Sequence, residues 1–283
     1  MNIGIFDSGF GGLSIYREIK QLMPEYNYIY LGDNANAPYG ERSFDDVFEL
    51  TKQGVERLQQ MGCPLVVLAC NTASAKALRN IQQRVLPYSD DPTRRVLGVV
   101  RPTVERIEQF TYSGHIGILA TTATVTSQSY EMELEKITTS LRLDFKPLVV
   151  NSHACPTWVP LIEQGHTDSK ELHDAVLRDM KELLDADPLI DAIILGCTHF
   201  PLIASVIQQV LVEIHKPEII LMPQGKPVAY ALRNWLHRHP EMDERLAKES
   251  KTEFYTTGDV ERFKKFAPEF LNLNEEIEVK KAP

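Results

Sequence analysis

The chain has 283 residues, 43% hydrophobic and 24% charged, which suits one large globular domain or two of ordinary size. Its net charge of −9 argues against a general nucleic-acid surface, which would carry a basic face. No run approaches the roughly 20 apolar residues of a membrane helix, and the first residues lack the features of a signal peptide. We therefore expect a cytoplasmic protein that binds neither nucleic acid nor membrane. Four cysteines are too few for a disulfide scaffold.

Short apolar runs alternate with longer amphipathic segments along the chain. This alternation predicts a largely parallel α/β architecture with helices on both faces of the sheet. The runs at 65–69 and 192–195 are apolar throughout, which is typical of central parallel strands. The expected strands are 2–6, 28–31, 65–69, 96–100, 116–120, 145–150, 192–195, 218–221 and 253–256, and the main expected helices are 43–61, 73–85, 169–184 and 202–214.

Two pairs of similar segments indicate an internal duplication. Residues 3–8 resemble 116–121, and 67–72 resemble 194–199. We therefore expect two similar doubly wound, parallel-sheet lobes rather than one continuous barrel. The expected first lobe is discontinuous, spanning 1–97 plus 209–283, and the second spans 98–208. Pro223-Gln224-Gly225 and the strand-like 253–256 belong to the returning part.

Polar residues follow four of the expected strands, where open α/β sheets bind their ligands. These segments begin at Asp7, Gly32, Cys70 and Cys197. The glycine-rich segment after Asp7 fails the last position of the dinucleotide fingerprint and has no Walker-type lysine. It is better interpreted as a tight turn that brings Ser8 and backbone amides close to a small ligand.

Cys70 and Cys197 differ from the other two cysteines. Cys63 and Cys155 fit the ordinary interpretation of a buried small hydrophobic residue. Cys70 and Cys197 each end a buried strand and precede small hydrogen-bonding residues at an expected helix start. A helix N-terminus stabilises a thiolate and binds carboxylates through its free amides.

Several kinds of site use cysteines in this way. A metal centre is disfavoured because the chain has no Cys-x-x-Cys pair, and Cys197 with His199 lacks a common zinc spacing. A cysteine hydrolase with His199 as its base leaves the second cysteine unexplained. A redox pair leaves the flanking Asn, Thr and His residues unexplained, and requires Cα atoms within about 7 Å.

Inversion of a stereocentre needs two equivalent acid/base groups on opposite faces of one carbon. A reference thiol pKa of about 8.5 lets one cysteine be thiolate while the other is thiol. Hydrogen-bond donors must also stabilise the developing carbanion. Candidate donors are Ser8, Asn71, Thr72 and Thr198.

At these residues the sequence closely resembles the bacterial glutamate racemases. The matching pieces lie in the family's order and span roughly residues 3–229: Asp7-Ser8-Gly9-x-Gly11-Gly12, Asp33 with Pro38-Tyr39-Gly40, Ala69-Cys70-Asn71-Thr72-Ala73 and Gly196-Cys197-Thr198-His199-Phe200-Pro201. The resemblance implies two lobes facing each other across the active site. It also implies reversible interconversion of L- and D-glutamate without pyridoxal phosphate or metal, with D-glutamate feeding peptidoglycan synthesis, and a homodimer.

The resemblance also assigns roles to residues. It implies that Cys70, assisted by Asp7, acts on the D-glutamate face, and that Cys197, assisted by His199, acts on the L-glutamate face. Glu163 resembles an acidic residue near the second cysteine. Substrate contacts are implied for Asp7, Ser8, Tyr39, Gly40, Asn71, Thr72, Thr121, Thr124, Thr198 and His199, with Pro38 beside them. Simpler roles remain open: a helix cap for His199, a turn-fixing role for Asp7 and packing for Tyr39.

Two segments depart from the family pattern. Residues 99–103 replace an acidic residue and glycine that many members carry around the proline, and 222–225 replace Asp-Ser-Gly. Both are interpreted as lobe connections. The nearest rival is an aspartate or other acidic amino-acid racemase, in which an acidic residue is expected in place of His199. A regulatory protein-binding role, such as the gyrase binding ascribed to some members, is a rival of a different class.

Overall fold

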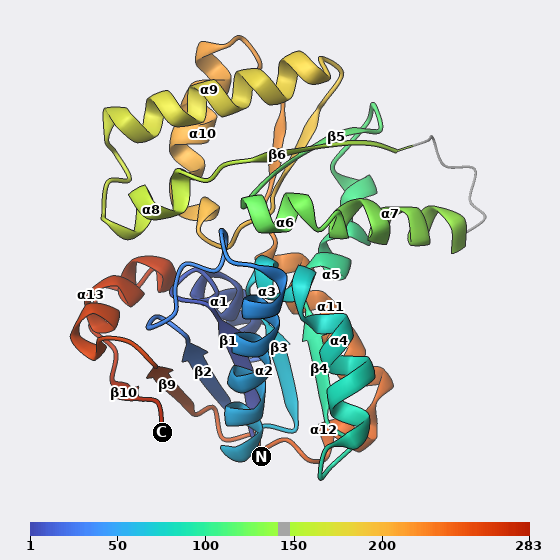
Figure 1. The fold of residues 1–283 in the computed structure, drawn as a ribbon, viewed down its shortest axis with the longest axis vertical. Coiled ribbons are helices and arrows are strands. Elements are labelled where there is room, and N and C mark those ends of the chain that lie inside the picture. Colours follow the sequence, from blue (N-terminus) through green and yellow to red (C-terminus); the bar gives the residue numbers. More distant parts are fainter. Residues whose placement is uncertain (141–147) are drawn as a thin grey trace.

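The computed structural model describes residues 1–140 and 148–283, and its strands form two all-parallel sheets that lie in two lobes (Figure 1). The first sheet has the order β10 (Val279–Lys281), β9 (Thr252–Thr256), β2 (Tyr28–Gly32), β1 (Ile3–Asp7), β3 (Leu65–Leu68) and β4 (Arg95–Gly98). The second has the order β6 (Val149–Ala154), β5 (His115–Ala120), β7 (Ala192–Leu195) and β8 (Ile220–Met222). The predicted fold class, two parallel α/β lobes, is confirmed.

Helices cover both faces of the first sheet because successive strand residues point to opposite sides. Ile3 and Ile5 of β1 pack in one apolar cluster with Leu13 and Phe263, whereas Phe6 packs with Val47 on the other face. The helices that carry the first cluster are α1 (Leu13–Leu22), α11 (Gly225–Arg238), α12 (Pro240–Asp243) and α13 (Val260–Leu271). The opposite face is covered by α2 (Phe44–Gln60), α3 (Asn71–Lys76), α4 (Leu78–Asn80) and the short turns Ile81–Val85 and Leu86–Tyr88.

The second sheet is covered in the same way. Ile193 of β7 packs with Met180, and its neighbour Ile194 packs on the opposite face with Tyr130. One face carries α8 (Trp158–Glu163), α9 (Lys170–Ala186), the turn Phe200–Ile203 and α10 (Ala204–Glu213). The other carries α5 (Val100–Val104), the turn Ile107–Gln109 and α7 (Ser129–Ser140), while α6 (Thr122–Thr126) follows β5.

The chain passes between the two sheets twice. It leaves the first sheet after β4, near Val99, and returns after β8, at Pro223 and Gln224. The chain was expected to return to the first lobe at residue 209. It returns later, because α10 packs in the second lobe's apolar cluster and β8 pairs with β7 of the second sheet. The division into lobes by sheet membership is therefore about 1–98 plus 223–283 and 99–222.

Most expected elements appear close to their expected bounds. Ser43 and Ser169 cap α2 and α9 by accepting hydrogen bonds from Asp46 N and Leu172 N. The helix expected over 73–85 is interrupted at Ala77, and the strand β10 was not anticipated. The strand expected over 145–150 begins outside the described residues, and β6 extends four residues beyond its expected end. None of the described helices combines the length and apolarity needed to cross a bilayer.

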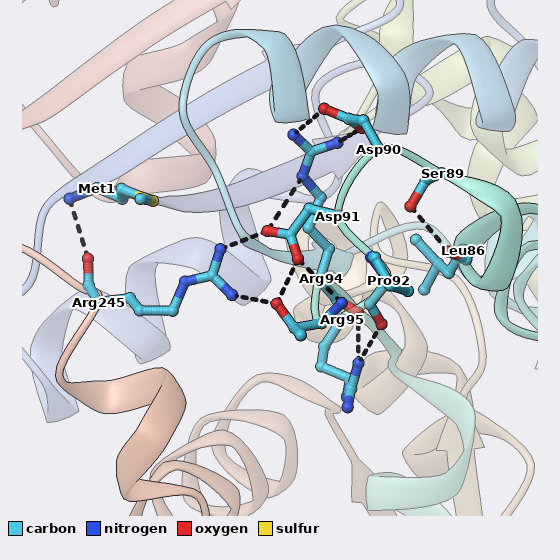
Figure 2. A network of polar contacts seen from close by, with 10 residues as sticks. Met1, Leu86, Ser89, Asp90, Asp91, Pro92, Arg94, Arg95 and Arg245 are labelled. Carbon is cyan, nitrogen blue, oxygen red and sulfur yellow. Dashed lines mark hydrogen bonds and ion pairs between the residues drawn. The ribbon is translucent and has the colours of Figure 1, made fainter.

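A surface polar network fastens the returning C-terminal part to the first lobe (Figure 2). Arg245 donates to Asp91 at 2.6 Å, and its carbonyl oxygen accepts from the Met1 amino group at 3.1 Å. Arg94 forms a two-pronged pair with Asp90 at 2.5 and 3.0 Å. Hydrogen bonds from Thr93 and Arg245 hold the pKa of Asp91 at about 2. The network therefore joins the loop before β4, the N-terminus and the segment after α12.

Candidate active site

Cys70 and Cys197 line one small cavity from opposite lobes. Each follows the carboxyl end of a central strand, β3 or β7, and each is 5% exposed. The cavity has a volume of about 50 Å³. The residues expected at the site that line it are Ser8, Pro38, Tyr39, Gly40, Cys70, Asn71, Thr72, Thr121, Glu163, Cys197, Thr198 and His199. Asp7 and Thr124 do not line the cavity, but Thr124 contacts Thr72 and Thr121, and the Asp7 carboxylate acts electrostatically on Cys70.

The Cys70 thiol has polar neighbours but lies in a strongly desolvated position. Its Sγ lies 3.4 Å from Ser8 Oγ and 3.5 Å from Ala73 N. Burial raises the pKa of Cys70 to about 12, and the Asp7 carboxylate adds to this rise, whereas the bonds from Ser8 and Ala73 oppose it. In this conformation Cys70 is therefore held as a thiol.

Asp7 combines a structural contact with an unused oxygen. Its Oδ2 accepts a hydrogen bond from Gly9 N at 2.8 Å, which fixes the glycine-rich turn. Its Oδ1 is buried and finds no hydrogen-bond partner among the described residues. Burial raises the pKa of Asp7, and the positive charge of His199 only partly opposes that effect. Asp7 thus fixes its turn and also supplies a titratable oxygen close to Cys70.

The Cys197 side has a different electrostatic character. His199 Nδ1 lies 3.8 Å from Cys197 Sγ, and its Nε2 lies 3.0 Å from Glu163 Oε1. Burial acts to lower the pKa of His199, but its bonds to Cys197 and Glu163 outweigh burial and raise that pKa well above its usual value. Burial likewise acts to raise the pKa of Glu163, and His199 reverses that effect. The contacts of His199 with Cys197 and Glu163 therefore favour the protonated form of its imidazole. The His199 side chain makes no helix-capping hydrogen bond.

Hydroxyl groups from both lobes meet beside the cysteines. Thr72 Oγ1 lies 3.0 Å from Thr121 Oγ1 and 3.5 Å from Thr124 Oγ1, so the three threonines form one cluster. Thr121 and Thr124 belong to the start of α6 in the second lobe, whereas Thr72 belongs to α3 in the first. These groups can donate hydrogen bonds to a carboxylate in the cavity.

The loop at 38–40 closes the cavity from the first lobe. Tyr39 is buried, and its hydroxyl donates to Asp33 Oδ2 at 2.6 Å. Asp33 also accepts hydrogen bonds from Asn36 and Thr257, so it holds the loop rather than facing the cavity. The carbonyl oxygen of Gly40 accepts from Ala123 N at 2.9 Å. This loop is thereby bonded to the second lobe.

The side chain of Asn71 makes hydrogen bonds within the protein that the sequence did not reveal. Its Nδ2 donates to Gln224 Oε1 at 2.6 Å, and its Oδ1 accepts from the Tyr130 hydroxyl at 2.8 Å. Gln224 was interpreted only as part of a lobe connection, and Tyr130 was not singled out. The one available signal was that 222–225 departs from the family pattern.

Other features of the molecule lie apart from the cysteine pair. A larger cavity of about 440 Å³ lies between α4, α5, α7 and α11, and neither Cys70 nor Cys197 lines it. Among the described residues, His153, Cys155 and Asp179 have potential metal-ligand atoms within 4.8 Å of one another. None of these three lines the small cavity, and the Asp179 carboxylate already accepts from Trp158 and Arg178.

Two parallel α/β lobes that each present a strand-end cysteine to one cavity define an amino-acid racemase architecture. A model of the Asp/Glu/hydantoin racemase family matches residues 3–222, and the chain belongs to this family. Within it, the chain is similar to a curated glutamate racemase of Paracoccus denitrificans, with 39% identity over 96% of this chain and 97% of that protein.

Two solved structures extend this similarity to the fold. Glutamate racemase isoform RacE1 from Bacillus anthracis has a TM-score of 0.83 and 32% identity, covering 100% of this chain and 97% of that one. Glutamate racemase from Francisella tularensis in complex with D-glutamate has a TM-score of 0.80 and 26% identity, with the same coverages. The resemblance to bacterial glutamate racemases that the sequence motifs indicated is confirmed.

Proposed function

We propose that this chain interconverts L- and D-glutamate by proton transfer between the substrate Cα and two cysteines, without a cofactor. The observation that carries the proposal is that Cys70 and Cys197 line the same cavity from opposite lobes. A carbon held between them has one thiol group on each face, which is the arrangement that inversion requires.

The reaction balances with one proton removed and one delivered. In the direction from L-glutamate, the Cys197 thiolate takes the Cα proton, and the electron pair left on Cα is delocalised into the adjacent carboxylate. The Cys70 thiol then gives its proton to the opposite face, so that Cys197 ends as thiol and Cys70 as thiolate. The roles exchange in the reverse direction. The protonated His199 is the partner that a thiolate at Cys197 needs, and Asp7 assists Cys70.

Hydroxyl and amide donors lower the barrier by stabilising charge on the substrate carboxylates. Ser8 and Thr198 flank the two cysteines, and the threonine cluster of Thr72, Thr121 and Thr124 offers donors from both lobes. Fixed donors in a water-poor site stabilise a developing anion without reorganisation. These groups therefore carry the role that pyridoxal phosphate has in other racemases.

Glutamate is the favoured substrate for two reasons. The similar proteins are named glutamate racemases, and one was solved with D-glutamate. His199 also stands where the aspartate type is expected to carry an acidic residue. The accompanying proposals are a cytoplasmic location, a homodimer and a role in supplying D-glutamate for peptidoglycan synthesis.

In the test, purified protein that has been treated with a metal chelator and kept free of pyridoxal phosphate is incubated with L-glutamate, and the circular dichroism of the amino acid is followed. Racemisation abolishes the dichroic signal, and L-aspartate in a parallel run should retain it. Cys70→Ala and Cys197→Ala should each lose at least about 100-fold in rate, because each removes one of the two acid/base groups. Cys63→Ala is the matched control and should keep the wild-type rate. A retained signal with L-glutamate would refute the proposal, and loss with L-aspartate alone would favour the rival.

A further inference from the structure

A buried amide lies where the chain returns from the second lobe to the first. Gln224 is 2% exposed and immediately precedes α11. Its side-chain atoms reach three segments that are distant in sequence. Nε2 lies 2.7 Å from the Tyr130 hydroxyl, 3.0 Å from Thr103 Oγ1 and 3.1 Å from Asn71 Oδ1, and Oε1 accepts from Asn71 Nδ2 at 2.6 Å. We call Asn71, Thr103, Tyr130 and Gln224 the Gln224 cluster.

The hydrogens in this cluster can be assigned without conflict. The two Nε2 hydrogens of Gln224 go to Tyr130 and Thr103, which lie nearest. Tyr130 then donates its own hydrogen to Asn71 Oδ1, and Thr103 donates to the carbonyl oxygen of Val99 at 2.8 Å. Each of these hydrogens therefore has an acceptor, and satisfied donors are the condition under which a buried polar network rigidifies a structure rather than weakening it.

The cluster joins both places where the chain passes between lobes. Gln224 marks the return, and Thr103 connects it to Val99, which marks the departure. Val99 N also lies 3.3 Å from Ser74 Oγ, and that hydroxyl donates to Leu68 O at the end of β3. The helix α3 is therefore held at two points, through Asn71 and through Ser74, by residues of the crossings.

The held helix directly follows Cys70 and carries Asn71 and Thr72 into the cavity lining. The cavity volume of about 50 Å³ has room for only a few waters, since by the same measure one water needs about 10–15 Å³, so the cavity is too small for glutamate. Entry of a substrate therefore requires the lobes or the lining to move. Any change in the angle between lobes acts first at the two crossings, where the cluster lies.

We propose that Gln224 is a positioning residue that couples the two lobe crossings to Asn71 and the start of α3. Movement of the lobes and placement of the substrate-facing residues on the Cys70 side then occur together. Gln224 itself does not line the cavity. The inference deepens the proposed function and rests on it for its kinetic consequence.

The test is Gln224→Met, which keeps the side-chain length and removes the amide. Its KM for glutamate should rise about tenfold while kcat falls less than about threefold, because ground-state placement of the substrate is what the lost hydrogen bonds support. Tyr130→Phe should raise KM by a smaller factor and add little in the Gln224→Met background, because both changes break one network. Gln82→Met, at an exposed glutamine that donates to Val96 O, is the matched control and should behave as wild type.

Amide hydrogen exchange gives a readout that does not depend on activity. Gln224→Met should speed exchange in both 71–76 and 225–238 and leave that of α9 unchanged. Unchanged exchange in 71–76 would overturn the inference whether or not the wild type racemises glutamate. An unchanged KM, or a lowered melting temperature with wild-type kinetics, would overturn the inference, because Gln224 would then have only a structural role. A wild type inactive on glutamate would instead refute the proposed function, and the exchange result alone would then decide the coupling.

Discussion

At the scale of single residues, the two cysteines face the cavity with unlike electrostatic partners. Cys70 lies near the Asp7 carboxylate, and the pKa of its thiol is raised to about 12. Cys197 lies beside a histidine that Glu163 helps to keep protonated. In this conformation Cys70 is therefore held as a thiol and His199 carries a positive charge, which is the arrangement from which the proposed step on L-glutamate starts.

Glu163→Gln tests this asymmetry. The substitution removes a cause of the raised His199 pKa, so His199 should lose its proton at a lower pH than in the wild type. The basic limb of the kcat/KM profile should move to lower pH, with a fall of about tenfold near pH 8. A profile measured between pH 6 and pH 10 checks this. Glu182→Gln removes a carboxylate beside His153, outside the cavity, and should leave the profile unchanged; an unshifted profile in Glu163→Gln would contradict the assignment.

The same shift has a consequence for stability. The pKa of His199 in the folded protein is raised above its unfolded value, so protonated His199 favours the folded state. That contribution is fully present below the unfolded pKa of about 6.5 and is lost as pH rises through the folded value. Glu163→Gln should therefore lose more stability at pH 6 than at high pH, where the histidine is neutral in both states.

The sequence could predict those site residues that are marked by a pattern in their neighbouring residues. Asp7, Ser8 and Cys70 lie at strand ends of the first sheet and Cys197 at a strand end of the second, and this placement could be predicted from the sequence pattern alone. Asn71 lines the cavity, and its side-chain amide also donates a hydrogen bond to Gln224, a partner 153 residues away. No local pattern encodes such a pair, because it exists only after the crossings have folded.

At the scale of elements, the helix α13 supports the Cys197 side from the first lobe. The Phe270 ring lies edge-on to His199 at 5.6 Å between centroids. Arg262 Nη2 donates to the carbonyl oxygen of Glu163 at 3.3 Å and lies 4.0 Å from its carboxylate. The Arg262 guanidinium also lies over the ring of Phe10. This helix thus connects the returning C-terminal part to His199 and Glu163 of the other lobe.

Arg262→Met should lower kcat/KM by about two- to fivefold with little change in melting temperature. The effect is modest because the Arg262 side chain is 53% exposed and exposed ion pairs contribute little. Lys264→Met, on the same helix but paired with Glu261, should have wild-type kinetics. Equal effects of the two substitutions would contradict a specific role for Arg262.

The elements that the sequence predicted well had strong local signals. The helices expected over 43–61 and 169–184 begin close to their expected starts, where Ser43 and Ser169 cap α2 and α9. The strand β10 escaped prediction because three residues with two exposed lysines show no apolar run. The interruption of the helix expected over 73–85 has no signal in the sequence, since neither Gly nor Pro occurs at that point.

At the scale of the whole molecule, close contact between the lobes builds the candidate site. Ser14 Oγ lies 3.0 Å from the carbonyl oxygen of Thr198, and Gly11 lies against Thr198 and His199. A Cβ at Gly11 would lie 2.5 Å from His199 Nδ1, so only glycine permits this approach. The expected lobe boundary at residue 209 falls within α10. The sequence of this helix does not show to which lobe it belongs, and only the pairing of β8 with β7 assigns it to the second.

Gly11→Ala should push His199 away from Cys197 or separate the lobes. We expect a stability loss of about 1–3 kcal/mol, as for other overpacked sites, together with a rate loss of at least about tenfold per folded molecule. Urea unfolding and initial rates measure the two effects separately. A stable variant with wild-type rate would contradict the close contact.

The most direct test of the two-cysteine account is racemisation of L-glutamate in D₂O, stopped at low conversion and analysed by proton NMR after separation of the enantiomers. Two monoprotic thiols predict that the D-glutamate formed carries deuterium at Cα, because Cys70 delivers a proton taken from solvent. The recovered L-glutamate should retain protium, since Cys197 can return only the proton it removed. Deuterium at similar levels in both enantiomers, or protium retained in the product, would contradict proton transfer by two separate groups.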